Sequence, residues 1–196
     1  LDRRLDNHGD ELGRTLAALR TRVELHSAAA NTANGRRVLF DARSLQSPSF
    51  GTRGIGRFAH AALRATRDVV SDAELDLLID GGLEELTPEI AGDTRLVTQV
   101  TSATVGEYGT VIEPSPMTAT PRPLTPLLHS NAMKIAIVFD FIPAHFPTVY
   151  IPHCAAAAEY AVSLDALSRY ENFLCISHDT AGEMSKWLQT YGRDLP

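Results

Sequence analysis

Short apolar runs alternate with longer helical stretches from residue 37 onward, and this alternation limits the possible folds more than any other feature. The runs predicted as strands are Arg37–Asp41, Leu75–Ile79, Arg95–Val100, Met133–Phe139 and Phe173–Ile176. Strands that alternate with helices are typical of parallel sheets, because parallel neighbours need long crossover connections. The sequence therefore predicts an α/β fold with a mainly parallel sheet.

Helical spacing of apolar residues fills most of the intervals between these runs. It predicts helices at 55–69, 83–86, 154–167 and 179–188. The segment Val105–Ile112 is ambiguous. Prolines crowd the interval from Pro114 to Pro126, and they disfavour both a helix and a central strand there. We expect a long extended loop, a kind of segment that is often functional.

The first 35 residues differ in texture from the rest and are predicted to be an amphipathic helix with a linker. Apolar residues recur at helical spacing from Leu5 to Val23, and the small-residue stretch 28–35 follows. His8, Thr15 and Arg22 occupy the second seam that a coiled coil would need. This favours a docking or linker helix over a coiled coil.

Composition argues against several classes of function. The net charge is −6, from 24 acidic and 18 basic residues without a basic block, which disfavours binding to nucleic acid. Cys154 and Cys175 lack the spacing of a disulfide framework or a zinc site. No stretch approaches the length of a membrane span, and no signal peptide is evident. We expect no transmembrane segment, and a cytoplasmic protein.

The sequence GTRGIGR lies between the first predicted strand and the next helix. Backbone N–H groups at such a helix start can cradle a phosphate or admit a sugar closely. We interpret Gly51, Gly54 and Gly56, with Arg53 and Arg57, as a ligand-binding loop. The alternative, that the glycines only permit a tight turn with positive φ, remains open.

The residues present argue against one nucleotide-binding family and exclude another. Short-chain dehydrogenases place GxxxGxG directly after the first strand, whereas here the spacing is GxxGxG and nine residues separate Asp41 from Gly51. They also need a tyrosine four residues before a lysine, and neither Lys134 nor Lys186 has one. A P-loop is excluded because no glycine precedes Lys-Ser or Lys-Thr.

Asp140 opens the segment DFIP directly after the predicted strand Met133–Phe139. Open α/β sheets bind ligands at the carboxyl ends of their strands, and a carboxylate there can orient a hydroxyl or act as a base. The alternative is that Asp140 only caps the following turn. His145 and His153 follow without a ligand at i+4 helical spacing, and we predict that they bind no metal.

The segment CISHDT again joins a predicted strand to a helix. Ser177, Asp179 or Thr180 can serve as the N-cap, and Glu183 is placed to complete a capping box with Thr180. Adjacent residues cannot arrange a nucleophile, a base and an orienting acid in line, and no GxSxG motif occurs. These observations argue against a hydrolase triad.

Four segments in this order and spacing resemble one family. They are VLFDAR, GTRGIGRFA, DFIPAHFP and FLCISHDTAGEMSKWL. Together they are similar to the N-terminal half of a retaining GT-B glycosyltransferase of the family-four type, over residues 37–192. The resemblance implies half of a GT-B fold, in which residues 36–196 form a Rossmann-like, three-layer acceptor-side domain after the helix and linker of 1–35.

The resemblance also implies roles for particular residues. Those facing the donor phosphates or the acceptor would be Gly51, Arg53, Gly54, Gly56 and Arg57. Asp140 would be the catalytic residue that orients the acceptor, and Ser177 and His178 would line the cleft. Phe139 stands where many members carry a histidine, so that histidine's role cannot be transferred. The family's glutamate pair, eight residues apart, is absent, and with it the donor half.

The function so implied is transfer of a hexose from a nucleotide sugar to a glycan or lipid-linked acceptor with retention, as in polysaccharide biosynthesis. It needs no metal ion and no cofactor besides the nucleotide sugar as donor substrate. A C-terminal GT-B domain in the parent chain would complete the enzyme, in the cytoplasm or at the inner membrane face, and the isolated chain would be inactive. The alternative is a non-catalytic Rossmann-like scaffold or a carbohydrate-binding module of a larger protein.

Overall fold

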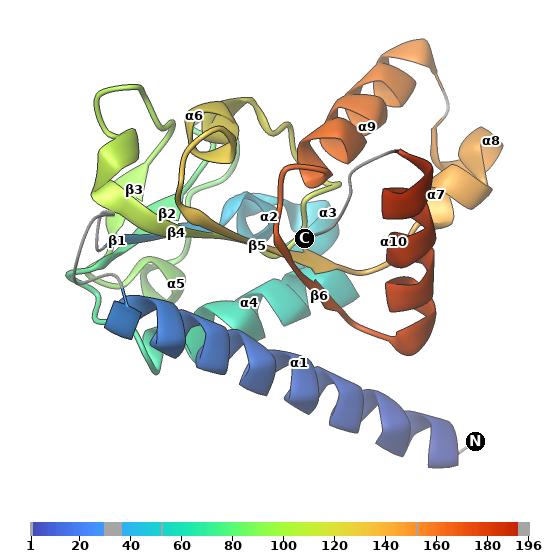
Figure 1. Cartoon of the computed structure of the whole chain (residues 1–196), viewed down its shortest axis with the longest axis horizontal. Helices are drawn as coiled ribbons and strands as arrows, with labels where there is room; N and C mark the ends of the chain where they lie inside the picture. Colours follow the sequence, from blue (N-terminus) through green and yellow to red (C-terminus); the bar gives the residue numbers. More distant parts are fainter. Residues whose placement is uncertain (1, 30–36, 52, 152, 192–196) are drawn as a thin grey trace.

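Six parallel strands form one sheet in the order β3-β2-β1-β4-β5-β6 (Figure 1). The computed structural model describes residues 2–29, 37–51, 53–151 and 153–191. The strands are Arg37–Asp41 (β1), Leu75–Leu78 (β2), Arg95–Val97 (β3), Tyr108–Glu113 (β4), Met133–Val138 (β5) and Asn172–Cys175 (β6). The predicted α/β fold is confirmed, and every strand pair in the sheet is parallel.

Helices account for most of the connections between the strands. The long helices are α1 (Asp2–Ala29), α4 (Gly54–Arg67), α9 (Cys154–Leu167) and α10 (His178–Thr190). The short ones are α2 (Arg43–Gln46), α3 (Pro48–Gly51), α5 (Pro88–Ala91), α6 (Thr125–Leu128), α7 (Ile142–His145) and α8 (Pro147–Tyr150), with 3₁₀ turns η1 (Val105–Glu107) and η2 (Arg122–Leu124). None of the helices in the described ranges is both long enough and apolar enough to cross a membrane.

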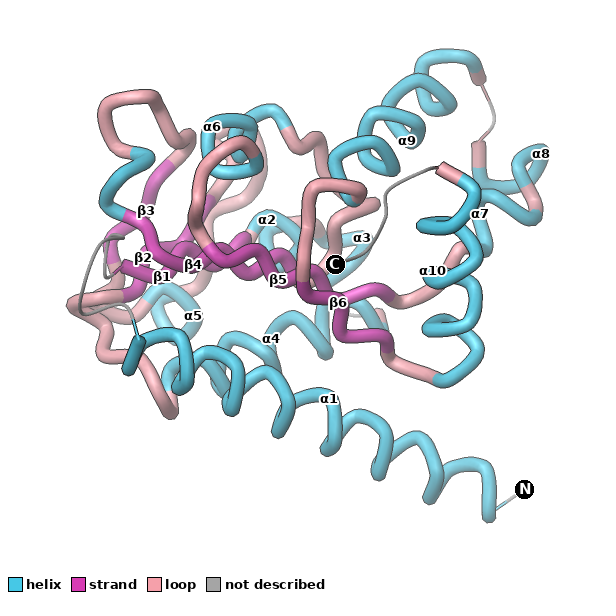
Figure 2. The backbone as a smooth tube through the Cα atoms, viewed as in Figure 1, coloured by secondary structure: helices cyan, strands magenta, loops and turns pink. Residues whose placement is uncertain are grey.

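The sheet lies between two helical layers, which gives the Rossmann-like, three-layer architecture. Figures 1 and 2 show α4 and α5 below the sheet, and α6 and α9 above it. Crossovers between parallel strands are right-handed, so the direction in which successive strands are added decides the face that each helix covers. The chain moves outward from β1 to β3 and then from β4 to β6, which puts the two sets of helices on opposite faces.

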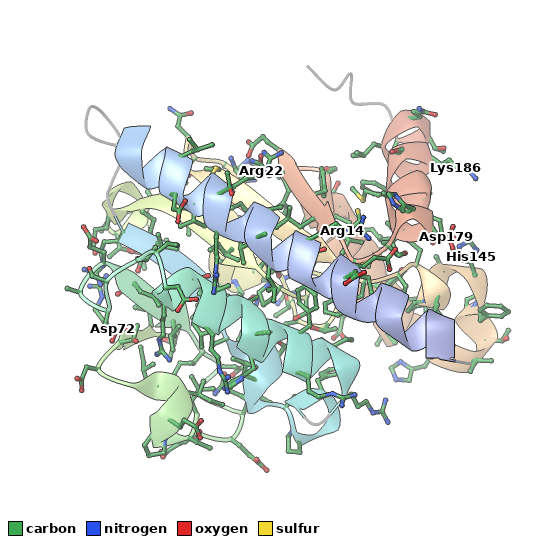
Figure 3. All side chains as sticks on the ribbon, turned by 90° about the horizontal axis from the view of Figure 1, so that it is seen from below. Arg14, Arg22, Asp72, His145, Asp179 and Lys186 are labelled. Carbon is green, nitrogen blue, oxygen red and sulfur yellow. The ribbon has the colours of Figure 1, made fainter. Side chains whose placement is uncertain are left out.

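Helix α1 covers part of the lower face beside α4 (Figures 1 and 3). It contacts α4, β4 and β6. Leu19 and Val23 are fully buried in the same apolar cluster as residues of the sheet, while Arg20 pairs with Asp68 and Arg22 donates to the side chain of Asn172. The predicted amphipathic helix is confirmed, and it docks on the sheet. Linker residues 30–35 lie outside the described residues.

We expect Leu19→Ala to lower the free energy of unfolding by about 3 kcal/mol, because it removes buried methyl groups and leaves a cavity under the sheet. The matched control is Leu25→Ala on the same helix, where the leucine is 67% exposed and the effect should stay within about 0.5 kcal/mol. Chemical denaturation of both variants measures the difference. Equal losses would show that α1 does not contribute to this core.

A buried carboxylate joins four strands at the amino edge of the sheet. Asp76 of β2 is fully buried and accepts hydrogen bonds from Arg37 Nε at 3.0 Å, Arg95 Nε at 3.0 Å and the Tyr108 hydroxyl at 2.9 Å. Burial alone would raise the pKa of Asp76, but these donors outweigh it and hold the pKa below its usual value. The carboxylate therefore stays charged, and its three partners begin β1, β3 and β4.

Three predictions about local structure differ from the observed fold. The ambiguous segment 105–112 holds the 3₁₀ turn η1 and the first five residues of β4, one of the two central strands. The predicted helix at 83–86 is wrong, since the helix in this interval begins at Pro88. The proline-rich interval is not extended throughout, because α6 begins at Thr125 with a proline in its first turn. Proline is tolerated there, where a helix has no use for its missing N–H.

Candidate functional site

Three acidic residues, of which only Asp140 was predicted to be functional, lie at the carboxyl ends of neighbouring strands. Asp41 ends β1, Glu113 ends β4, and Asp140 follows β5. Because the strands are parallel and neighbouring, these ends lie at one edge of the sheet, where open α/β sheets bind ligands. This edge is the candidate site.

Asp140 lines a cavity of about 80 Å³ at this edge. The other walls are Ile55 in the first turn of α4, residues 115–118 after β4, and Pro143 in α7. Asp140 is partly exposed, and its Oδ1 accepts a hydrogen bond from the backbone N–H of Ile142 at 3.0 Å. The carboxylate thus caps the following turn, which confirms that interpretation, and it also borders the cavity, where its role toward a ligand stays a prediction.

The glycine segment is mostly helical, and the predicted loop is wrong in this respect. Gly51 ends α3, while Gly54, Gly56 and Arg57 lie in the first turn of α4. Among the described residues only Gly92 has a positive φ, so the turn interpretation of these glycines is wrong as well. A Cβ at Gly54 would meet nothing within 4 Å, and the glycine leaves open space at the helix start.

The side chain of the N-cap residue does not cap the amino end of α4. Arg53, the N-cap residue, is extended and makes no capping hydrogen bond, although its carbonyl accepts from the N–H of Arg57 at 3.0 Å. Both arginines are exposed, and neither guanidinium pairs with another described residue. An uncapped helix start beside two cations favours an anion, and Ile55 connects it with the Asp140 cavity.

Ser177 and His178 lie apart from the Asp140 cavity. Ser177 is the N-cap of α10, and its Oγ accepts from the N–H of Thr180 at 3.1 Å. Thr180 in turn donates to the carbonyl of Phe139 at 2.8 Å, which joins α10 to the end of β5. His178 is exposed and lines a different cavity of about 320 Å³, between α1, β6 and α10. The structure therefore places these two residues at a different cavity from the one that Asp140 lines.

The two histidines near the site each make a hydrogen bond within the protein. His145 of α7, labelled in Figure 3, lies 2.8 Å from Glu183 of α10 through its Nε2 atom. Glu183 therefore does not complete the capping box predicted for it. His153 is the N-cap of α9 and accepts from the N–H of Ala156. Within the described ranges, no group of three His, Cys, Asp or Glu residues is placed to hold a metal ion.

A buried polar cluster under the site was missed by the sequence analysis. Arg43 binds Asp41 in a bidentate pair, with Nε to Oδ1 at 2.9 Å and Nη2 to Oδ2 at 2.6 Å. Its Nη1 donates to the carbonyl of Thr120 at 2.5 Å. Glu113 accepts from the Tyr170 hydroxyl, and its other oxygen lies 3.8 Å from Arg43. The cluster fastens the segment after β4 to the sheet.

Burial changes the protonation of the carboxylates in this cluster to different degrees. Burial first, and then the carboxylate of Asp41, raise the pKa of Glu113 to about 8, against the lowering effects of Tyr170 and Arg43. Burial and Glu113 also raise the pKa of Tyr170 well above its usual value. Near neutral pH, Glu113 is therefore mainly protonated, and Asp41 and Arg43 form the ion pair. The only sequence signal for this cluster was an acidic residue at the end of β1 and of β4.

Comparison with known proteins identifies no relative. No protein-family model matches the chain, and neither a curated protein nor a solved structure is significantly similar to it. The functional argument therefore rests on the residues of the site and on the resemblance of its motifs.

Proposed function

We propose that the chain is the acceptor-side domain of a glycosyltransferase that transfers a hexose from a nucleotide sugar, with retention, to a glycan or lipid-linked acceptor. The observation that carries this proposal is the Asp140 cavity. A carboxylate and an uncapped helix start border the same cavity at the carboxyl edge of the sheet. An acceptor hydroxyl and a donor phosphate need these two kinds of group.

Asp140 orients the acceptor in this proposal. One of its oxygens is held by the N–H of Ile142, which fixes the orientation of the carboxylate. The acceptor hydroxyl binds to this carboxylate and forms the new bond to the anomeric carbon, while the old bond from that carbon to the diphosphate breaks. The electron pair leaves with the nucleoside diphosphate, which also takes up the hydroxyl proton.

The amino end of α4 stabilises the charge that develops on the leaving group. The N–H groups of its first turn and the cations of Arg53 and Arg57 provide this stabilisation. The space left by Gly54 allows a phosphate to approach the backbone. In this proposal the donor substrate is a nucleotide sugar. Its nucleotide is bound by a second domain, the C-terminal GT-B domain, which is the partner of this chain.

Calorimetric titration with UDP- and GDP-sugars tests this division of the site. We expect no measurable binding by the 196-residue chain, and binding by the parent protein extended beyond Pro196. Tight nucleotide binding by the 196-residue chain would contradict the division, because it would make the α4 region a self-sufficient nucleotide site. Saccharide binding without transfer by the extended protein would support the non-catalytic alternative instead.

Asp140→Asn separates the catalytic role from the structural one. Asparagine can still accept the hydrogen bond from Ile142, so the fold should be preserved. We expect transfer by the extended protein to fall by about 10²-fold, the scale of losing a group that orients a reactant. Asp93→Asn, at an exposed position, is the control and should leave transfer unchanged. An active Asp140→Asn variant would reduce Asp140 to a turn cap.

A further inference from the structure

Strand β6 forms one edge of the sheet, and among the described residues it pairs only with β5. The backbone N–H of Ile176, directly after β6, donates to the carbonyl of Val138 in β5 at 3.2 Å. In a parallel ladder, alternate residues turn their N–H and C=O groups toward the same neighbour. The backbone groups of Phe173 and Cys175 therefore turn away from β5. They form the row of donors and acceptors that a further strand can join.

A groove follows this free edge. It is the cavity of about 320 Å³ between α1, β6 and α10, and residues 173–176 line it along the edge. Helix α1 belongs to the lower face of the sheet and borders the groove with residues from Glu11 to Ala18, while α10 borders it with His178 and Ala181. Figures 1 and 3 show β6 between these two helices. The position beyond β6 is thus open at the edge and flanked by helices, as the positions of inner strands are.

Helix α10 packs in the upper layer. Its buried residues Met184 and Leu188 belong to the same apolar cluster as Leu127 of α6 and Leu167 of α9. The crossovers that contain α6 and α9 lead from β4 to β5 and from β5 to β6, and each moves one position outward. A crossover of the same right hand through a helix on the same face moves in the same direction. A strand that follows α10 therefore arrives at the free edge of β6.

The surroundings of the groove also determine the chemistry of the added strand. Successive side chains of a strand point to opposite faces of the sheet, here toward α10 and toward α1. Neighbouring residues of β6 already belong alternately to the upper and the lower apolar cluster. A strand that is buried on both faces is a nearly continuous apolar run. The groove therefore fits an apolar run of about the length of β6, rich in Val, Ile and Leu.

We propose that this groove receives a seventh, parallel strand, formed by an apolar run that follows α10 in the parent protein. The strand pairs with the outward backbone groups of Phe173 and Cys175, and it anchors the start of the remaining chain to this domain. The proposal takes from the proposed function only that the parent protein continues beyond Pro196. None of the described residues that line the groove also lines the Asp140 cavity.

Amide hydrogen exchange in the 196-residue chain and in the parent protein extended beyond Pro196 tests the proposal. In the 196-residue chain we expect the Phe173 and Cys175 amides to exchange fast, and the Ile176 amide, which is bonded to Val138, to exchange slowly. In the extended protein the protection of Phe173 and Cys175 should rise by about 100-fold or more, because an amide paired inside a sheet exchanges only when the strand opens. Ile176 is the internal control and should change much less.

Ala181→Arg blocks the groove without altering any backbone group of β6. Ala181 is partly exposed on α10 and lines the groove, so an arginine there takes the space of the added strand. We expect this variant to reduce the protection of the Phe173 and Cys175 amides in the extended protein by about tenfold or more. The melting temperature of the 196-residue chain should stay unchanged. Gln189→Arg, at an exposed position of the same helix, adds the same charge outside the groove and is the control.

Three outcomes would overturn the proposal: the two outward amides exchange equally fast in both proteins, they are already protected in the 196-residue chain, or Ala181→Arg leaves their protection at the level of Gln189→Arg. In the second case, protection that rises with concentration together with dimers in sedimentation would make a second copy of the chain the occupant. The test is separable from that of the proposed function. Protected amides in an extended protein that transfers no sugar would keep the seventh strand and reject the glycosyltransferase, whereas sugar transfer with unprotected amides would reject the strand and keep the enzyme.

Discussion

Asp76→Asn should lower the free energy of unfolding by about 3 kcal/mol, the largest single loss that we expect from a polar substitution in this chain. Three donors, from Arg37, Arg95 and Tyr108, converge on a carboxylate with no exposed surface. The amide removes the negative charge and turns an NH₂ group toward guanidinium donors. Both arginines are partly exposed and can partly recover hydration, which keeps the loss below the upper end of the range for buried pairs.

Urea denaturation at neutral pH measures this loss. The control is Asp68→Asn, which breaks an exposed pair with Arg20 and should cost less than about 1 kcal/mol. A second expectation follows from the lowered pKa of Asp76. The stability that it contributes is present above the usual aspartate pKa and disappears as the pH falls through the lower folded value. Equal losses in the two variants would show that the Asp76 network is not a stabilising unit.

Glu113→Gln should remove a pH dependence that the wild type shows between about pH 4.5 and pH 8. In this range the unfolded carboxyl has lost its proton, whereas the folded one retains it, because its pKa is raised to about 8. Unfolding then releases a proton, so stability falls with rising pH by up to about 1.4 kcal/mol per pH unit. Glutamine is neutral throughout, and its oxygen can still accept from the Tyr170 hydroxyl.

Denaturation series at pH 5, 6, 7 and 8 check this prediction. The Glu113→Gln variant should show a flatter profile and should be more stable than the wild type at pH 8. Glu89→Gln, at an exposed position in α5, should reproduce the wild-type slope. A flat wild-type profile, or a slope that survives in Glu113→Gln, would mean that the buried carboxyl ionises normally.

Local sequence patterns predicted the elements that have an uninterrupted apolar run or helical spacing of apolar residues. The first strand and helix 154–167 have the predicted bounds, because an apolar run and a helical spacing stand between clear breaks. Strand β4 was ambiguous, since Gly109 and Thr110 interrupt its apolar run. What makes it a strand is pairing with both β1 and β5, and no local pattern reports this pairing.

Prolines caused the other errors in the predicted elements. Pro88, Pro126, Pro143 and Pro147 all lie in the first turn of a short helix. Of these, the sequence analysis treated only Pro126, within the proline-rich interval that begins at Pro114, as a signal against a helix. A proline excludes a helix only where the N–H would be needed, and that is after the first turn.

The candidate site could be predicted only in part for a similar reason. Asp140 was identifiable because it directly follows the clearest strand. The bond from Arg43 to the carbonyl of Thr120 was not, since it depends on how the segment after β4 folds back over the sheet. The same holds for the pairing of Tyr170 with Glu113, which are 57 residues apart.

The docking of α1 on the sheet also affects the order in which the chain can fold. The helix is synthesised well before β6, yet Arg22 reaches Asn172, 150 positions later. Closing so long a loop costs conformational entropy before its contacts can compensate, and a high mean sequence separation of contacts slows folding. On the ribosome, α1 can therefore pack against α4 and β4 as they emerge, while its contacts with β6 form last and complete the docking.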